Sequence, residues 1–226
     1  MKKVRVEAST KKDRTSEIFG NPMSKKVIRK AQKSKQKNQK KYGDDSKVNY
    51  QCIIRDNSCI GEPLGVKNVV VTRKEGKGSF DEEKGVIVGN IRMGFGHYRI
   101  SMAIASAAHA LGYTPYWMDL NSYPETTCTK LISAQNELYS LGSRISQKSK
   151  LFNKFVWEPV NYEGFRQLSY NAADQKNAEL MAPVYHSVPK NIPVIATHVW
   201  PAQAAVHAGM KHVVNAIPDN WPMALH

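Results

Sequence analysis

One stretch constrains the fold of this chain more than any other: GVIVGNIRMGFGHYRISMAIASAAHALGYTPYWMDL, residues 85–120. It opens with an apolar run rich in β-branched residues, which is typical of a strand covered on both faces. Apolar residues then recur at helical spacing until Gly112. The residues of this stripe are Ile100, Ala103, Ile104, Ala107, Ala108 and Leu111. YTPYWMDL, residues 113–120, predicts a second strand, so the stretch is strand, turn, helix and strand.

The same alternation continues after residue 120. Helical periodicity covers 129–157 and 161–188, strands are expected at 192–198 and 211–217, and a short helix at 201–209. Strands and helices that alternate through short connections pair in parallel with right-handed crossovers. We therefore expect an α/β fold with a Rossmann-like open parallel sheet and helices on both faces in residues 85–226.

The N-terminal part has a different composition. Residues 1–47 hold 16 Lys and Arg against 5 Asp and Glu, a net charge of +11, whereas the other 179 residues carry only +3. With few apolar residues, this arm is expected to be disordered or a frayed helix. Residues 48–84 form a transitional segment in which only VKNVVVT, residues 66–72, predicts a strand. The expected organisation is thus an arm, a transitional segment and a domain over 85–226.

Other sequence signals bear on location. The chain has three cysteines, Cys52, Cys59 and Cys128, whose spacing matches no usual zinc site, so free thiols are expected. No run of about 18 apolar residues and no signal sequence is found. A cytoplasmic protein is the simplest expectation.

The turn after the first strand, RMGFGHYR, is the leading candidate site, because ligands of such sheets bind at the carboxyl ends of the strands. Gly94 and Gly96 permit a tight turn and close approach of a ligand to the backbone. The N-terminus of the helix that follows favours anions. His97 stands at this entrance, where the helix disfavours the imidazolium, and a neutral ring can accept a proton. The alternative is that His97 only caps the helix.

A dinucleotide-binding fingerprint is a rival interpretation of the same turn. GFGHYR begins like G-x-G-x-x-G but carries Arg99 in place of the third glycine, which weighs against NAD. Asp119 ends the second strand about where a ribose-binding acid belongs, which weighs for it. No G-K-[ST] motif is present, so a P-loop is excluded.

Two further motifs follow later strands. His198 in VIATHVWP closes the strand at 192–198, and Asp219 and Trp221 in IPDNWPMALH follow the strand at 211–217. A carboxylate at Asp219 is suited to act as a base or to orient His97. The structural alternatives are a backbone-bonded His198 and an Asx-type turn at Asp219.

Taken in order, these motifs resemble the monogalactosyldiacylglycerol synthase group of glycosyltransferases, which is similar to the cell-wall UDP-N-acetylglucosamine transferases. In that group a glycine-histidine turn leads into a helix with Ser and Ala at the positions of Ser101 and Ala103. A strand ending in Asp, a Thr-His or Ser-His pair near a proline, and a late Asp before Trp and His then follow. The resemblance covers about residues 85–226.

The resemblance implies a two-domain GT-B fold, in which the N-terminal domain binds the acceptor and the C-terminal domain binds the sugar nucleotide, such as a UDP-sugar. This chain would be the acceptor part, ending before a donor-binding domain. The reaction would be inverting transfer of a sugar to a hydroxyl, with a lipid as a candidate acceptor, and would need no metal or other cofactor. His97 or Asp219 would be the base. Substrate would be bound by Gly94, Gly96, Arg99, Ser101, Asp119, His198 and Trp221.

Partners other than substrate follow from charge and aromatic residues. In RISQKSKLFNKFVW, basic residues flank Leu151, Phe152, Phe155 and Trp157, which suits either peripheral membrane contact or an ordinary helix over the sheet. Nucleic acid is an unfavoured partner, because no aromatic residues are interleaved with the lysines of the arm. The competing functions are a nucleotide-binding module of the NAD type, a non-catalytic descendant and nucleic-acid binding through the arm.

Overall fold

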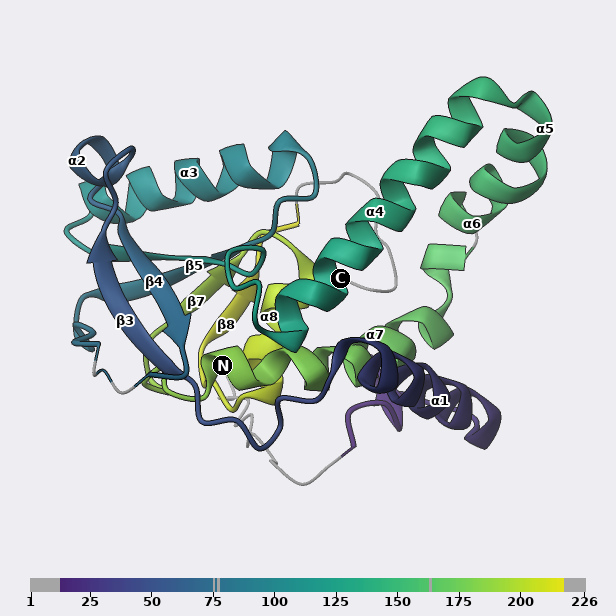
Figure 1. Ribbon diagram of the computed structural model, residues 1–226, viewed down its shortest axis with the longest axis horizontal. Helices are drawn as coiled ribbons and strands as arrows, with labels where there is room; N and C mark the ends of the chain where they lie inside the picture. The colour runs from purple at the N-terminus through teal and green to yellow at the C-terminus, as the bar shows by residue number, and fades with distance from the viewer. Residues whose placement is uncertain (1–12, 75, 77, 163, 218–226) are drawn as a thin grey trace, which may run out of the picture.

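The computed structural model describes residues 13–74, 76, 78–162 and 164–217, and a six-stranded sheet lies at its centre (Figure 1). The strand order is β3-β4-β6-β5-β7-β8, with β3 antiparallel to β4 and all other neighbours parallel. The strands are β3 Gln51–Asp56, β4 Lys67–Thr72, β5 Gly85–Asn90, β6 Thr114–Asp119, β7 Val194–Ala196 and β8 Val213–Asn215. A separate two-stranded ribbon pairs β1 Glu17–Ile18 with β2 Asn21–Pro22.

Helices cover both faces of this sheet. They are α1 Lys25–Tyr42, α2 Gly61–Leu64, α3 Phe95–Ala110, α4 Thr127–Lys148, α5 Lys150–Phe152, the π-helix η1 Asn153–Trp157, α6 Glu158–Tyr162, the 3-10 turns η2 Gly164–Arg166 and η3 Ala182–Tyr185, α7 Leu168–Met181 and α8 Val199–His207. Val88 of β5 packs with Ala105 of α3, whereas Ile87 packs with side chains of α4, α7 and α8. Neighbouring residues of one strand thus face opposite layers. The expected α/β sheet flanked by helices is confirmed.

The sheet takes in residues that precede the regular alternation. β3 and β4 form an antiparallel pair, with Cys52 opposite Val71, and β4 joins the parallel strands through β6. The β-branched run VKNVVVT predicted β4, but no strand was expected at β3, whose run QCIIRD is short and carries two charges. The structural unit therefore begins well before residue 85, inside the segment described above as transitional.

The buried face of α3 overlaps only in part with the apolar stripe of its sequence, since Ala108 belongs to both and Ile104 is half-buried. Ser101, Ala105 and Ala108 are its buried residues, whereas Ala103 and Ala107 are exposed. The helix is rich in small residues on every side, so its sequence has only a weak preference for one face. The orientation is fixed by tertiary contacts, among them the edge-to-face contact of Tyr98 with Trp117 at 5.3 Å between ring centroids.

Residues 25–42 of the basic arm form a helix that packs on α7, so of the two alternatives given above disorder was wrong for this part of the arm. These residues form α1, which lies against α7 (Figure 1). Ala31 is 1% exposed and clusters with Ile18 and with Ala172 of α7. A small side chain lets the two helix backbones approach closely, so the contact needs few large apolar residues.

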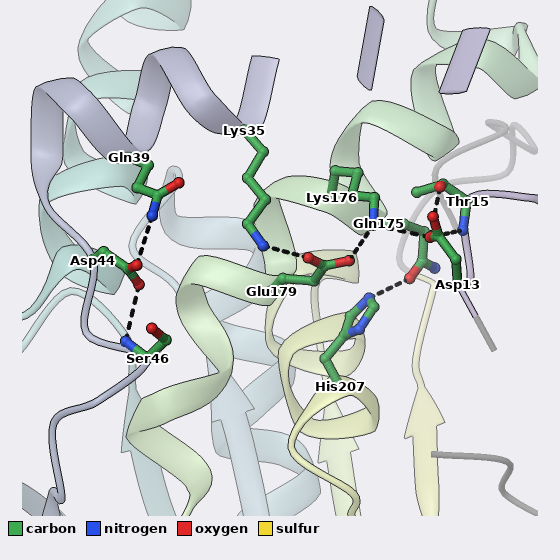
Figure 2. A network of polar contacts seen from close by, with 10 residues as sticks. All are labelled: Asp13, Thr15, Lys35, Gln39, Asp44, Ser46, Gln175, Lys176, Glu179 and His207. Carbon is green, nitrogen blue, oxygen red and sulfur yellow. Dashed lines mark hydrogen bonds and ion pairs between the residues drawn. The ribbon is translucent and has the colours of Figure 1, made fainter. Parts of the chain in front are cut away.

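Polar contacts complete the attachment of α1 to α7 (Figure 2). Lys35 donates to Glu179 at 2.5 Å, and Lys176 bonds Glu179 at 2.7 Å and Asp13 at 3.0 Å. Asn38 of α1 donates to Asn177 at 2.9 Å. Burial alone raises the pKa of Glu179, but the bonds from the two lysines outweigh burial and hold this pKa below its usual value. The buried Lys176 ammonium of α7 is thus matched by two carboxylates, and Glu179 also pairs with Lys35 of basic α1.

Candidate functional site

The candidate site lies at the carboxyl ends of β5 and β7, where the strand order reverses. From β5 the chain passes through α3 to β6 on one side, and from β7 it passes through α8 to β8 on the other. Neighbouring strands whose crossovers diverge leave a crevice between their connections, which is the usual ligand position in open α/β sheets. His97 follows β5 and His198 follows β7, so this topology brings the two histidines together.

His97 is held in one orientation by the main chain of the neighbouring strand. Its Nδ1 lies 2.5 Å from the carbonyl oxygen of Thr197. A carbonyl can only accept, so Nδ1 carries the proton and Nε2 of the neutral ring is left with a lone pair. Among the described residues, Nε2 makes no hydrogen bond. In this tautomer, set by a backbone acceptor, a neutral imidazole can accept a proton at Nε2.

Two buried hydroxyls fix the segment that holds His97. Ser101 Oγ donates to the carbonyl oxygen of His97 at 2.9 Å and lies 2.9 Å from Thr197 Oγ1. The single hydroxyl proton of Ser101 is donated to the carbonyl oxygen of His97. Thr197 is therefore the donor in the second bond. Ser101 and Thr197 are both 0% exposed. Ser101, expected above as a substrate-binding residue, thus positions His97 from inside the fold.

His198 extends the site toward α7. Its ring lies edge-on to His97, with 5.0 Å between centroids, and its Nδ1 accepts from the backbone N–H of Trp200 at 3.2 Å, which caps α8. Trp200 packs against His198 at 4.8 Å, and its indole N–H donates to Asp174 of α7. Four side chains from three separate segments therefore form one continuous row: His97, His198, Trp200 and Asp174.

The turn before α3 is open toward solvent and rich in hydrogen-bond donors. Gly94, the N-cap, has φ 77°, a conformation that favours glycine, and no side chain caps the helix. A Cβ placed on Gly94 or Gly96 would meet no atom within 4 Å, so the backbone is accessible. The first turn of α3 contains no acidic residue. Its unpaired N–H groups therefore present partial positive charge to any bound group.

Asn90, at the end of β5, adds a buried polar group beneath this turn. It is 0% exposed, and neither its amide nitrogen nor its amide oxygen has a hydrogen-bond partner among the described residues. Alternation along β5 places Asn90 on the same face as Val88, the face that α3 covers. A buried amide without partners is costly, and such groups are concentrated where a ligand or water completes the bonding.

Asp119 is fully engaged within the protein. Oδ1 accepts from the backbone N–H of Asn121 at 2.9 Å, and Oδ2 accepts from Ser122 Oγ at 2.9 Å and Arg92 Nε at 2.8 Å. Arg92 also donates its backbone N–H to the Asn121 side chain at 2.7 Å. These bonds tie the end of β5 to the end of β6. The geometry is that of a turn-stabilising carboxylate, and a ribose would have to compete for both oxygens.

Three other residues were expected at the site: Arg99, Asp219 and Trp221. Arg99 is exposed on the first turn of α3. Asp219 and Trp221 lie outside the described residues. The structure therefore brings together His97, Ser101, His198 and the glycine turn, and sets Asp119 to the side of β5 away from β7. Thr197, Asn90 and Asp174 were not anticipated; only the position of Thr197 beside His198 offered a signal in the sequence.

Asp174 has the most strongly raised carboxyl pKa among the described residues. Burial raises its pKa to about 7, although the bond from Trp200 opposes the shift. Because the folded-state pKa lies above the unfolded value of 3.8, the stability associated with Asp174 is present at acidic pH and is lost as pH rises toward and through 7.

Replacing Asp174 with Asn is therefore expected to stabilise the protein in a pH-dependent manner. At pH 8 the gain should be about 1–3 kcal/mol, since one pKa unit corresponds to about 1.4 kcal/mol and solvent screens part of the effect. At about pH 4 the gain should nearly vanish, because the carboxyl is then neutral in the folded state. Urea denaturation at the two pH values measures this. Asp56→Asn, at an exposed position, is the control variant measured in parallel, and a pH-independent effect at Asp174 would contradict the assignment.

Two further findings concern metal ligands and the lengths of the helices. Among the described residues, no group of three or more His, Cys, Asp and Glu side chains is arranged to hold a metal ion. In the same part of the chain, every helix is too short or too polar to cross a bilayer.

Comparison with known proteins gives a family without an assigned activity. No curated protein and no solved structure matches the chain. A family model described as a domain of unknown function, DUF6937, matches residues 17–226. The match spans α1, the sheet and the candidate site together, and the chain therefore belongs to the DUF6937 family.

Proposed function

We propose that this chain is the acceptor-binding part of a glycosyltransferase of the two-domain GT-B type, acting on a hydroxyl acceptor. The observation that carries the proposal is the geometry of His97 at the switch point of the sheet. Its Nδ1 is bonded to the Thr197 carbonyl and its Nε2 is available to accept a proton. The resemblance of the glycine-histidine turn and the Thr-His corner to the monogalactosyldiacylglycerol synthase group supports the same function.

In the proposed reaction, His97 Nε2 takes the proton of the acceptor hydroxyl as the hydroxyl oxygen attacks the anomeric carbon of the sugar. The bond from that carbon to the nucleotide diphosphate breaks, and the diphosphate leaves with the electron pair. The result is an imidazolium at His97, a new glycosidic bond and inversion at carbon. Backbone N–H groups of the α3 turn are suited to stabilise the negative charge that develops nearby.

Nucleotide binding of the NAD type is the alternative function. Asp119 is at the right strand end for a ribose, but its two carboxylate oxygens are occupied by Asn121, Ser122 and Arg92. Arg99 also stands where the fingerprint requires a glycine. Both facts favour the transferase proposal.

The test is a transfer assay on the full-length gene product. Radiolabelled UDP-glucose, UDP-galactose and UDP-N-acetylglucosamine are each incubated with the protein and a total membrane lipid extract, and label is measured in the organic phase and in small soluble acceptors. We expect label to move from one donor to an acceptor. Thermal stabilisation by NAD, with no transfer from any donor, would replace the proposal with the nucleotide-binding alternative.

A further inference from the structure

A helical hairpin projects from the body of the molecule and carries exposed apolar side chains. It comprises the second half of α4, α5, η1 and α6, residues 136–162, and it extends away from the sheet (Figure 1). Nine of the sixteen exposed large hydrophobic side chains of the described residues belong to it. These nine are Leu138, Tyr139, Leu141, Ile145, Leu151, Phe155, Val156, Val160 and Tyr162. So dense a patch on a small part of the surface indicates an interaction site.

The hairpin is a defined structure rather than a frayed end. Trp157 packs against Gly142, where an added Cβ would lie 2.2 Å from the ring, and its centroid is 5.3 Å from that of Tyr139. Ser149 caps the turn by accepting from the backbone N–H of Phe152 at 3.2 Å. The two arms are thus held together by their own contacts. The exposed residues lie on the outside of a packed hairpin.

The exposed residues form stripes with basic neighbours. Leu138, Leu141 and Ile145 follow helical spacing along α4, and Leu151 and Phe155, 72% and 67% exposed, continue the surface around the tip. Four basic residues lie among them: Arg144, Lys148, Lys150 and Lys154. Lys154 Nζ lies 5.7 Å from the centroid of the Phe155 ring. The sequence predicted an apolar surface made of Leu151, Phe152, Phe155 and Trp157. Phe152 and Trp157 are in fact half-buried, whereas other residues of the hairpin are exposed, so the apolar surface is larger than expected and is made of different residues.

More positive charge lies toward the same end of the molecule. Helix α1 contains nine Lys and Arg and no acidic residue, and it lies with the hairpin at one end of the longest axis (Figure 1). Only Lys35 of these pairs with a carboxylate among the described residues. The end of the molecule therefore combines apolar side chains with a large excess of positive charge.

We propose that the hairpin docks this protein on an anionic lipid bilayer, with its apolar side chains at the headgroup boundary. Apolar side chains interspersed with lysines are what a membrane interface accommodates, because the long lysine stems lie along the apolar surface while their charges reach the headgroups. Lysine is depleted in protein–protein interfaces, which disfavours a protein partner. The charge of α1 complements an anionic surface and adds attraction at longer range. This inference stands whether or not the chain has transferase activity.

The experiment is co-sedimentation of the protein with vesicles of phosphatidylcholine, with and without phosphatidylglycerol. We expect binding to the anionic vesicles, and a fall of about tenfold or more for the double variant Leu151→Ser/Phe155→Ser. The matched control is Leu111→Ser/Phe19→Ser, whose positions are 76% and 66% exposed but lie outside the hairpin, and it should bind as the parent does. Lys148→Gln/Lys150→Gln/Lys154→Gln should weaken binding to anionic vesicles by about tenfold or more.

A second measurement does not depend on the folding of a serine variant. Lipids brominated on the acyl chain should quench part of the tryptophan fluorescence of the parent, and Trp157→Phe should remove that quenched part, because Trp157 is the tryptophan of the hairpin sequence. Absence of binding by the parent, equal binding by the hairpin and control variants, or unchanged quenching in Trp157→Phe would overturn the proposal. The proposal would also be overturned if the hairpin variant lost dimerisation while its lipid binding stayed unchanged. The exposed apolar residues would then form a contact between two copies of the chain.

Discussion

Replacing His97 with alanine is expected to lower the rate of sugar transfer by about 10²–10⁴-fold, the usual contribution of a positioned general base. The reason is geometric: the Thr197 carbonyl fixes the proton on Nδ1, so Nε2 is the one basic atom that the ring can offer. The expected loss is in kcat. The rates are measured with the donor identified by the transfer assay, in the full-length protein.

A second substitution at the same position separates proton transfer from support of the fold. His97→Asn keeps an amide N–H near the place of Nδ1, where it can still donate to Thr197, but it removes the basic nitrogen. It should be as inactive as His97→Ala and closer to the parent in thermal stability. His212→Ala, at an exposed histidine, is the control and should be fully active. Retained activity in His97→Asn would exclude His97 as the base.

Replacing Ala31 with lysine is expected to lower the free energy of unfolding by about 3 kcal/mol. Ala31 is 1% exposed between α1 and α7, so a longer side chain overpacks the contact and brings a charge into it. Lysine forms helices almost as well as alanine, and α1 is already rich in lysine, so propensity does not account for such a loss.

The control for this substitution is Ala107→Lys on α3, at an exposed position, where the change should stay within about 0.5 kcal/mol. Both variants are compared with the parent by urea denaturation monitored by circular dichroism. Equal stability of Ala31→Lys and the parent would mean that α1 contributes no packing energy, as a disordered arm would require.

Local sequence patterns predicted some elements of this fold correctly, whereas elements that depend on tertiary contacts were predicted less well. The run GVIVGNI and the glycine-histidine turn are local patterns, and β5 and the start of α3 occur where these patterns predicted them. The apolar stripe of α3 matches its buried face only in part, because the many small residues of the helix leave the choice of face to the tertiary contacts of Tyr98 and Ser101. A packed α1 was not expected, because its apolar content is low; its contact with α7 depends on Ala31 and on the pairing of Lys35 with Glu179.

By itself, the sequence determined the alternation of strands and helices and the placing of His97 and His198 after two buried strands, because periodicity and glycine positions are properties of neighbouring residues. Only the tertiary structure decided that these strands are adjacent, that the Thr197 carbonyl sets the His97 tautomer, and that Trp200 links His198 to Asp174. It also decided that basic α1 is folded. These outcomes depend on contacts between residues far apart in the chain. The energies of such contacts cannot be inferred from the pattern of neighbouring residues.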